Sequence, residues 1–458
     1  MPEGTSGLAS RFTFAVSTMG CKANLTDSHA LESQLRSLGG SPVESDSSIP
    51  PDIFLLNTCT VTDQADREAG QLLRKSGAAL TIATGCYAEV DPERLKLAAA
   101  PGKSPLRILR NSAKHELGTL VDGWLAGTLA QQKEIWHGDR AAWHQNILPN
   151  RVAEESSSPS AEPRTRAFLK VQDGCNAFCS YCVIPMARGR SRSFPATQVV
   201  AEVQALADSG LKEVVLTAIH AADYDDNGLD FTGLVEKVLR ETSIRRLRLT
   251  SLDPAEIPDR LLALMAAEPR LCPHFHVSLQ SANSRVLAAM KRGYNAEAVE
   301  ERLEKIARAI PHAYVGMDLI AGFPGESDEE FKDGYERLAR LPWTRAHVFP
   351  FSVRQNTAAA RLVESGISVP AAKISERASQ LRELSAGKLR QALESRIGSV
   401  MEILVEGKEL KMENRRVSLG HSRSYFKIVI PGRHPANELK RVRILGTMAQ
   451  DCLKGELV

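Results

Sequence analysis

The chain has 458 residues, of which 43% are hydrophobic and 25% are charged, and its formal net charge is +3. This composition excludes a fully disordered chain, a collagen-like fibre and a small disulfide-bonded scaffold, and the length suggests several domains. The sequence contains no stretch near the roughly 18 apolar residues of a membrane span, and its polar start lacks the apolar core of a signal peptide. We therefore expect a cytoplasmic protein without membrane contact, whose eight cysteines are reduced thiols or metal ligands.

The first part of the chain alternates short apolar strands with helical patterns. Strands are expected at 12–17, 52–57, 80–84 and 106–110, and helices at 24–38, 63–75, 91–100 and 114–126. Alternation of this kind is typical of an open parallel sheet whose two faces are covered by helices. We expect this sheet to form an N-terminal domain over residues 11–126.

A linker is expected at 127–163, because its second half is rich in serine, proline and glutamate and has no periodic apolar face. Its first half, around Trp136 and Trp143, could be ordered. Alternation then resumes over residues 164–395, with six expected strands at 167–171, 213–218, 246–251, 274–279, 314–320 and 345–351. Six strand–helix units favour a partial barrel over a closed eight-fold one.

The last stretch, 396–458, consists of short expected strands between turns and favours a small β-barrel. It carries 12 Lys and Arg residues against 7 Asp and Glu residues, so this module is more basic than the chain as a whole. A small basic barrel is typical of an RNA-binding appendage. The alternative is an ordinary solvated β-domain.

Cys175, Cys179 and Cys182 form a CxxxCxxC run directly after an expected strand and the turn at 173–174. Three thiolates this close in the sequence can hold one iron–sulfur cluster and leave one iron open to a small molecule. A structural zinc site would want four protein ligands, and no fourth cysteine lies nearby in the sequence. The spacing therefore favours an iron–sulfur cluster over zinc.

Cys21, Cys59 and Cys86 each come just after the carboxyl end of an expected strand. In a parallel sheet these ends share one edge, where ligands bind, so the three side chains would converge on one point. The alternative is three buried core cysteines, since free cysteine is often simply buried. Cys272 and Cys452 fit neither pattern and are expected to be packed thiols.

The cysteine run and its surroundings resemble the radical S-adenosylmethionine (SAM) enzymes. The flanks QDGC at 172–175, CVIP at 182–185 and ARG at 187–189 resemble the methylthiotransferases in particular, as do TMGCKAN at 18–24, NTC at 57–59 and GC at 85–86. The C-terminal module resembles the TRAM domain of that family. The fold implied by the resemblance is α/β: an open parallel sheet domain, a partial (β/α)6 radical SAM barrel and a small TRAM-like β-barrel.

Within the family, the resemblance is closest to the type that methylthiolates carbon 2 of N6-threonylcarbamoyladenosine at tRNA position 37. The segments that carry this resemblance are TSLDP at 250–254, HVSLQS at 276–281 and HVFPF at 347–351. The types that act on isopentenyl-adenosine tRNA or on a ribosomal protein usually differ there. These two substrates remain the alternatives, together with a non-catalytic iron–sulfur RNA-binding protein.

The resemblance implies two [4Fe–4S] clusters, one on each cysteine triad, together with SAM. The cluster on Cys175, Cys179 and Cys182 would cleave SAM with an electron from a donor such as flavodoxin or ferredoxin, and the radical would take hydrogen from the adenine ring. The cluster on Cys21, Cys59 and Cys86 would present the sulfur, and a second SAM would supply the methyl group. No catalytic residue beyond the cysteines is implied, since hydrogen abstraction by a radical needs no initial base.

Two loops at strand ends are candidates for SAM contacts. Gln280 and Ser281 follow one expected strand, and Gly322 and Gly325 follow the next. The alternative for each is a loop that only supports the barrel. Three polar residues near strand ends are candidate substrate contacts: His220, Asp253 and Asp318. Four alanines stand where the family commonly carries glycine: Ala218, Ala221, Ala222 and Ala282.

Two groups of basic residues are candidates for binding tRNA. Arg188, Arg190 and Arg192 follow the cysteine loop, where contacts with phosphates would make binding salt-sensitive. The second group lies in the C-terminal module and comprises Lys408, Arg415, Arg416, Arg423 and Lys427. Either group could instead be a solvated face. The partner implied by the resemblance is the anticodon loop of tRNA, with the target base splayed out of the loop.

Overall fold

The structure is a computed structural model that describes residues 11–44, 49–100, 102, 104–138, 165–412, 415–448 and 451–458. The chain divides into two compact units. Unit 1 comprises Met1–Pro159 and Val183–Gly189, and unit 2 comprises Ser160–Cys182 and Arg190–Val458. In the described part of the chain, no helix combines the length and the apolar character that a membrane span requires.

Unit 1 is built on a parallel sheet with the strand order β2-β1-β3-β4-β5-β6. The strands are β1 (Phe12–Thr18), β2 (Gly40–Pro42), β3 (Ile53–Thr58), β4 (Leu80–Gly85), β5 (Leu106–Leu109) and β6 (Ile135–Trp136). From β1 the chain steps first to one side of the sheet and then to the other. In an open parallel sheet, ligands bind beyond the carboxyl ends of the strands at this reversal, which here is the β1/β3 edge.

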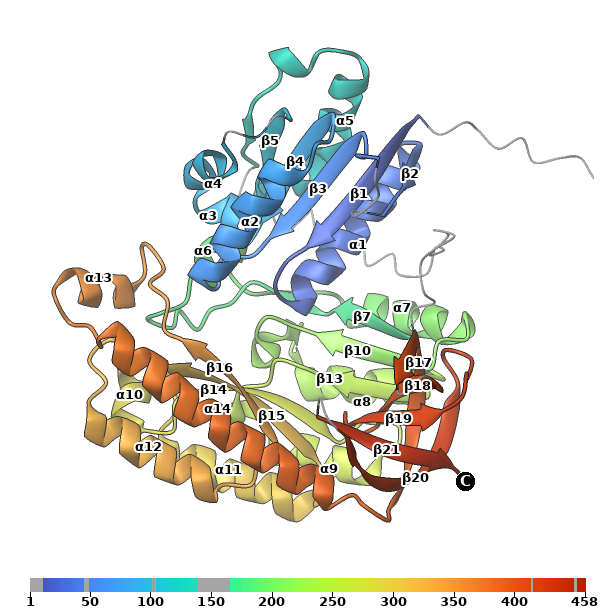
Figure 1. Ribbon diagram of the computed structural model, residues 1–458, viewed down its shortest axis with the longest axis vertical. Helices are drawn as coiled ribbons and strands as arrows, with labels where there is room; N and C mark the ends of the chain where they lie inside the picture. Colours follow the sequence, from blue (N-terminus) through green and yellow to red (C-terminus); the bar gives the residue numbers. More distant parts are fainter. Residues whose placement is uncertain are drawn as a thin grey trace, which may run out of the picture. The chain divides into compact units, whose positions relative to one another are not determined.

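Helices cover both faces of this sheet, as Figure 1 shows. One face is covered by α1 (Lys22–Ser37) and α5 (Leu117–Leu125), and the other by α2 (Asp63–Lys75), α3 (Cys86–Val90) and α4 (Pro92–Ala99). Successive residues of a strand point to opposite faces, so Leu55 packs with Leu31 of α1 while Leu56 packs with Leu73 of α2. Because both faces are buried, the central strands are apolar along their length.

Two edge strands of this sheet, β2 and β6, were not predicted from the sequence. They have three and two residues, and segments this short carry almost no period-two pattern. Residues 135–136 fall in the predicted linker, but Ile135 pairs with Ile108 of β5. The start of that segment, including Trp136, is therefore part of the sheet. Trp143 and the rest of the predicted linker to 163 lie outside the described residues.

Unit 2 contains six parallel strands in two sheets that follow each other in sequence order. The first sheet holds β7 (Arg166–Lys170), β10 (Glu213–Thr217) and β13 (Arg246–Leu249), and the second holds β14 (His274–Gln280), β15 (Tyr314–Ala321) and β16 (Arg345–Pro350). Two parallel bridges, Leu247 to Leu271 and Leu252 to Val277, join the sheets. The predicted partial α/β barrel is thereby confirmed.

Helices connect these strands and lie along the outside of the barrel (Figure 1). They are α7 (Ala196–Asp208), α8 (Phe231–Glu241), α9 (Asp259–Ala267), α10 (Ser284–Ala289), α11 (Ala296–Ala309), α12 (Asp328–Arg340), α13 (Ala358–Glu364) and α14 (Ala371–Glu394). A short antiparallel pair, β8 (Gln172–Asp173) with β9 (Arg192–Ser193), brackets the cysteine loop.

The C-terminal module is a closed barrel with the strand order β17-β18-β19-β21-β20, as predicted. Its strands are β17 (Val400–Met412), β18 (Arg415–Ser422), β19 (Lys427–Pro431), β20 (Leu439–Met448) and β21 (Cys452–Leu457). The apolar core of this barrel includes Ile403 and Ile428 and continues into Leu389 and Leu393 of α14. The core of this barrel is therefore continuous with α14 and with Tyr314 of β15.

A buried ion cluster supports the junction of the two barrels. Glu213 of β10 forms ion pairs with Arg246 and Arg248 of β13, each at 2.8 Å, and Arg248 also donates to the carbonyl of Arg423 at 2.8 Å. Burial raises the pKa of Glu213, but the charges of Arg248 and Arg246 outweigh burial and lower the pKa to about 2. Glu213 is therefore ionised and fully paired inside the molecule.

Candidate functional site

The cysteines of unit 1, which we call the sheet triad, are Cys21, Cys59 and Cys86. Cys21 precedes α1, Cys59 directly follows β3, and Cys86 opens α3 at the end of β4. Cys59 and Cys86 are buried, whereas Cys21 is exposed. Burial and the neighbouring thiols of Cys86 and Cys21 together raise the pKa of Cys59 to about 12. The structure thus brings together three thiols that are distant in the sequence, at the edge of the sheet where β1 and β3 diverge.

Two glycines allow the strand ends to approach each other this closely. Gly20 has φ +88°, and a Cβ there would lie 2.7 Å from Sγ of Cys59. Gly85 has φ +97°, and a Cβ there would lie 2.3 Å from the carbonyl oxygen of Thr58. Any side chain at these positions would be strained by the backbone and would collide with the neighbouring strand. Glycine before Cys21 and before Cys86 is therefore a condition of the triad's geometry.

Asn24 ties the ends of β1 and β3 together. Its Nδ2 donates to the carbonyls of Met19 at 2.8 Å and Thr58 at 2.9 Å. Asn57 in turn donates to the carbonyl of Asn24 at 2.8 Å. With Nδ2 held in this way, Oδ1 of Asn24 points to the triad and lies 4.0 Å from Sγ of Cys86. The sequence does not reveal these roles, because Asn24 and Asn57 reach partners more than 30 residues away.

The cysteines of unit 2, which we call the loop triad, are Cys175, Cys179 and Cys182. They lie on one loop after β8, where the amide of Cys182 donates to the carbonyl of Cys179 at 3.0 Å. Ser180 anchors this loop, since its amide donates to the carbonyl of Met290 at 3.0 Å and its Oγ donates to the carbonyl of Ala289 at 2.8 Å. The loop is thus fastened to the end of α10.

Two N–H groups point at sulfurs of the loop triad. Nη1 of Arg292 donates to Sγ of Cys179 at 3.3 Å, and the amide of Ala177 donates to Sγ of Cys175 at 3.4 Å. Arg292 is held in place by the carbonyl of Ser278 at 2.9 Å and by an ion pair with Asp253. Hydrogen bonds of this kind stabilise thiolate ligands and tune the metal centre. Arg292 was not predicted, because it lies 113 residues from Cys179 and carries no local motif.

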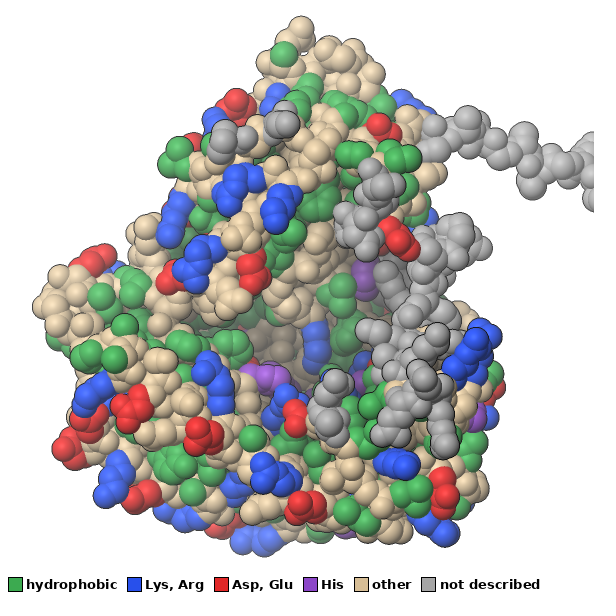
Figure 2. Space-filling model, in the orientation of Figure 1, with side chains coloured by type: hydrophobic (Ala, Val, Ile, Leu, Met, Phe, Trp, Pro, Cys, Tyr) green, Lys and Arg blue, Asp and Glu red, His purple; other side chains and the backbone are tan. Residues whose placement is uncertain are grey.

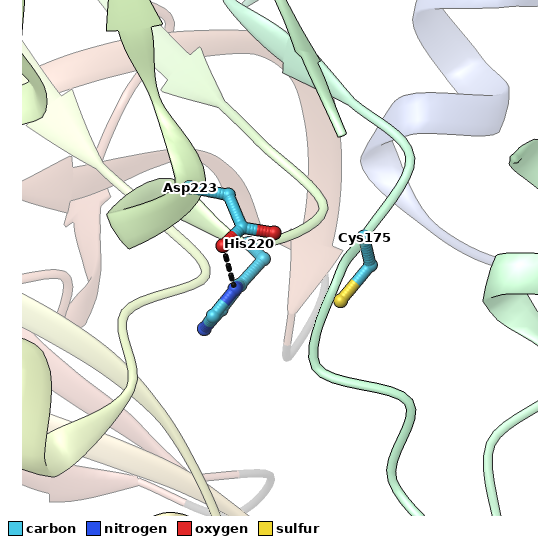
Figure 3. A group of neighbouring side chains, drawn as sticks. All are labelled: Cys175, His220 and Asp223. Atoms are coloured by element: carbon cyan, nitrogen blue, oxygen red, sulfur yellow. Dashed lines mark ion pairs between the residues drawn. The ribbon is translucent and has the colours of Figure 1, made fainter. Parts of the chain in front are cut away.

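His220 and Asp223 lie beside Cys175, as Figure 3 shows, and the ligand atoms of the three residues are within 4.8 Å of one another. Nδ1 of His220 is 3.2 Å from Asp223, and Nε2 is 2.7 Å from Glu256. Burial lowers the pKa of His220, but hydrogen bonds with Asp223, Cys175 and Glu256 outweigh burial and raise it to about 12. Both ring nitrogens of His220 thus face carboxylates, and the imidazole lies beside Cys175.

The donor sets at both triads fit an iron–sulfur cluster. Each place offers three cysteine sulfurs, which are the ligands that such clusters prefer. Each also has a cation close to its sulfurs: Arg292 contacts Cys179 in unit 2, and Arg188 forms a hydrogen bond with Cys86 in unit 1. A nearby cation favours the thiolate form that metal binding requires. The residues present therefore suit a cluster held by three thiolates in either unit.

The predicted SAM contacts lie at the carboxyl ends of the neighbouring strands β14 and β15. Gln280 has φ 71°, a strained conformation for a residue other than glycine, and strain of this kind concentrates at functional sites. Ser281 is buried and accepts from the amide of Asn283 at 3.2 Å. A Cβ on Gly322 would lie 2.5 Å from the side chain of Ile374 in α14. This close approach favours a supporting role for Gly322.

The loop that holds Gly325 is fastened to α14 by an ion pair. Glu326 accepts from Arg377 and from the amide of Gly322, at 2.8 and 3.1 Å. Gly325 itself has φ +80°, and a Cβ there would lie 3.3 Å from Ile367. Gly322 and Gly325 therefore both face apolar side chains, Ile374 and Ile367.

The three arginines after the cysteine loop do not form one surface. Arg190 is exposed, with its guanidinium 5.8 Å from the ring centroid of Phe178. The side chain of Arg192 is 9% exposed and ion-paired with Asp173 at 3.1 Å. Arg188 is only 2% exposed, because α6 (Ile184–Arg188) packs within unit 1. The prediction that Arg188 contacts RNA phosphates is therefore wrong, and Arg190 alone of the three is open to solvent.

The basic residues of the C-terminal barrel also differ in their exposure. Arg416 and Lys427 are exposed, whereas Arg423 is half-buried and donates to the carbonyl of Leu271 at 3.2 Å. The side chains of Lys408 and Arg415 lie outside the described residues. On the helices α11, α12 and α14 of unit 2, Figure 2 shows Lys and Arg interspersed with Asp and Glu, as in the pair Arg337–Glu300.

Comparison with known proteins defines the class to which this site belongs. The "Radical SAM superfamily" matches residues 169–338, which contain the loop triad and most of the partial barrel. The "Uncharacterized protein family UPF0004" matches residues 13–102, which contain the whole sheet triad. A solved structure of similar fold is that of TsrM from Kitasatospora setae, a radical S-adenosylmethionine methyltransferase, with a TM-score of 0.53 and 16% identity over 74% of this chain and 73% of that chain.

Curated relatives cover nearly the full length of the chain. "Threonylcarbamoyladenosine tRNA methylthiotransferase MtaB" of Aquifex aeolicus is 34% identical over 87% of this chain and 94% of the relative. The protein of the same name from Bacillus subtilis is 32% identical over 94% of each chain. "tRNA-2-methylthio-N(6)-dimethylallyladenosine synthase" of Chlorobaculum tepidum is 31% identical over 97% of this chain and 98% of the relative. The chain belongs to the radical SAM methylthiotransferase family.

Proposed function

We propose that this protein is a tRNA methylthiotransferase that adds a methylthio group to carbon 2 of N6-threonylcarbamoyladenosine at tRNA position 37. Five of the similar relatives carry the name of this enzyme, at 31–34% identity over 86% or more of the chain. Because the substrate is tRNA, we infer that the reaction takes place in the cytoplasm. The cofactors would be SAM and two [4Fe–4S] clusters, one on each triad.

The observation that carries the proposal is the pair of cysteine triads, each at the carboxyl edge of its own parallel sheet. A cluster on the loop triad would supply the electron that cleaves SAM, and one on the sheet triad would supply or carry the sulfur. One triad would suffice for radical chemistry alone. A second triad, assembled from three strand ends, calls for a second chemical task, and insertion of sulfur is the task that the family name states.

The side chains around the loop triad would hold the cysteines in their thiolate form and exclude water. Arg292 donates to Cys179, the amide of Ala177 donates to Cys175, and His220 lies beside Cys175. Gln280 and Ser281 would contact SAM from the end of β14. The electron would come from an external protein such as flavodoxin or ferredoxin.

For tRNA, the exposed cations Arg190, Arg416 and Lys427 would contact phosphates. Each such contact makes binding more sensitive to salt, because counterions are released from the RNA. Four segments would divide these tasks: the sheet domain at 11–126, which β6 (Ile135–Trp136) extends into the segment at 127–163, the rest of that segment as a linker, the radical SAM core at 164–395 and the TRAM-like barrel at 396–458. The target base would be splayed out of the anticodon loop to reach the reacting groups.

The test is an anaerobic reaction of the reconstituted enzyme with SAM, a reductant and tRNA that carries threonylcarbamoyladenosine. Nucleoside mass spectrometry should detect the methylthio product only with this tRNA. A matched tRNA with isopentenyl-adenosine and the ribosomal protein substrate serve as controls. A methylthio product on either control instead would show that the enzyme acts on that substrate. Absence of any methylthio product, with SAM still cleaved, would contradict the proposal.

A further inference from the structure

The short helix α6 (Ile184–Arg188) begins two residues after Cys182 of the loop triad, yet it belongs to unit 1. There, Nδ2 of Asn111 donates to the carbonyl of Ala187 at 2.9 Å. This bond fixes the end of α6 beside the 3-10 helix η1 (Asn111–Glu116). Arg188, the last residue of α6, is thereby placed in the interior of unit 1, where 2% of its surface is exposed.

The guanidinium of Arg188 contacts residues that build the sheet triad. Nη2 donates to Oδ1 of Asn24 at 2.6 Å, the same oxygen that lies 4.0 Å from Sγ of Cys86. Burial raises the pKa of Cys86, whereas the charge of Arg188 and a hydrogen bond from it lower that pKa. Arg188 therefore acts on Cys86 both directly and through Asn24.

The charges around Arg188 are arranged in a buried group. Asp27 accepts from Nη2 of Arg188 at 3.1 Å and from Nζ of Lys114 at 2.8 Å. Asp27 is 5% exposed and Lys114 is 6% exposed, so both are as enclosed as Arg188. The charges of these three side chains sum to one positive charge. A buried positive charge costs free energy unless a negative group lies next to it, and the thiolates that hold a cluster at the sheet triad would be such a group.

We propose that Arg188 is a positioning residue for the sheet triad, where its buried positive charge stabilises the reduced form of an iron–sulfur cluster held by Cys21, Cys59 and Cys86. This inference rests on the proposed second cluster. Reduction adds one electron from an external donor, and no bond forms or breaks. Three thiolates give the cluster a negative net charge that grows on reduction, and net charge and hydrogen bonds to sulfur set its potential. A cation beside Cys86 favours the reduced state more than the oxidised one.

The experiment uses a full-length variant in which Cys175, Cys179 and Cys182 are alanine, so that only a cluster on the sheet triad is observed. After anaerobic reconstitution, iron is counted and the midpoint potential is titrated by electron paramagnetic resonance. Arg188→Met should lower the ratio of reduced to oxidised cluster at a fixed potential by at least about tenfold, which is about 59 mV for one electron. Arg188→Lys, which keeps the charge, should shift the ratio much less.

Asp27→Asn provides a change of the opposite sign, because it removes a negative charge from the same buried group. It should raise the ratio of reduced to oxidised cluster, whereas a purely structural disturbance would not reverse the direction. Arg67→Met removes a charge from the exposed side of α2 and should leave the ratio unchanged. If Arg188→Met does not fold, the other two variants still decide the question. The ratio of reduced to oxidised cluster should rise in Asp27→Asn and stay unchanged in Arg67→Met.

Two results would overturn the inference, and they are distinguishable. If the cysteine variant with native Arg188 binds no iron, the second cluster of the proposed function fails, and this inference fails with it. If that protein binds about four irons, but Arg188→Met and Asp27→Asn leave the potential unchanged or shift it in the same direction, the proposed function stands and the role of Arg188 is refuted.

Discussion

The sheet triad of unit 1 and the loop triad of unit 2 gather the same three side chains by opposite means. Cys175, Cys179 and Cys182 lie within eight residues on one loop. Cys21, Cys59 and Cys86 come from the ends of three strands, and only the order of the sheet brings them together. A loop motif can be moved between folds, whereas a triad built from strand ends exists only when the whole sheet has formed.

The supports of the two triads differ in the same way. Backbone geometry holds the sheet triad, through Gly20, Gly85 and the bridging Asn24. At the loop triad, Ser180 fastens the loop to the end of α10, and the side chain of Arg292 reaches Cys179 from outside the loop. Variants that separate these supports should therefore affect one triad and leave the other intact.

The largest expected effect separates the tasks of the triads. Cys182→Ala should abolish cleavage of SAM, because the loop triad would lose one of its three ligands. Cys86→Ala should leave SAM cleavage intact and abolish only methylthio transfer to tRNA. Deoxyadenosine and modified nucleosides, both measured by mass spectrometry, distinguish these losses. Cys272→Ala, at a fully buried cysteine outside both triads, is the matched control and should keep both activities. Loss of SAM cleavage in Cys86→Ala would contradict this division.

The next effect concerns the backbone of unit 1. Gly85→Ala should destabilise the protein by about 3–5 kcal/mol, because a positive φ and a collision with Thr58 add together. Gly366→Ala is the control: its φ is +87°, but nothing lies within 4 Å of the added Cβ, so about 1–2 kcal/mol is expected. Urea denaturation measures both. Equal losses of stability in the two variants would show that the close approach of Gly85 to Thr58 does not add to the cost of a side chain.

Acid should destabilise unit 2 around the buried ion pairs of Glu213. The folded pKa of Glu213 is about 2, below its ordinary 4.5, so its ion pairs stabilise the fold above pH 4.5 and lose this contribution as the pH falls toward 2. The amount is on the order of 3 kcal/mol. The protection of the β10 and β13 amides against hydrogen exchange, corrected for the intrinsic exchange rate at each pH, should fall between pH 5 and 3. Glu213→Gln should remove this pH dependence, while Glu301→Gln, in an exposed pair with Lys305, should not. An unchanged profile in Glu213→Gln would refute the assignment.

A smaller effect is expected at the donor to Cys179. Arg292→Met removes the hydrogen bond to the sulfur and leaves Asp253 without its partner. Loss of an outer partner of this kind weakens metal binding by about 10- to 100-fold. Iron retention against a chelator, measured in a variant that lacks the sheet triad, would report this loss. Arg302→Met, on the outer helix α11 and paired with Asp259, should retain iron as the native protein does.

The sequence predicts the loop triad fully, because its spacing is local and sits after a strand. It predicts the sheet triad through topology, since each cysteine follows an apolar strand and parallel strands share an edge. The side chains that serve the triads could not be predicted in this way. Arg292 reaches Cys179 across 113 residues. Arg188 was interpreted as an RNA contact because its neighbours Arg190 and Arg192 form a basic run, and only the fold shows that α6 turns into unit 1.

Counting iron tests most directly whether the two triads are two separate cluster sites. Iron and sulfide are measured after anaerobic reconstitution of the native protein and of two triple alanine variants, one for each triad. We predict about eight irons in the native protein and about four in either variant. If the native protein holds only about four irons and the variant of Cys175, Cys179 and Cys182 holds none, the sheet triad binds no cluster and the central claim is contradicted.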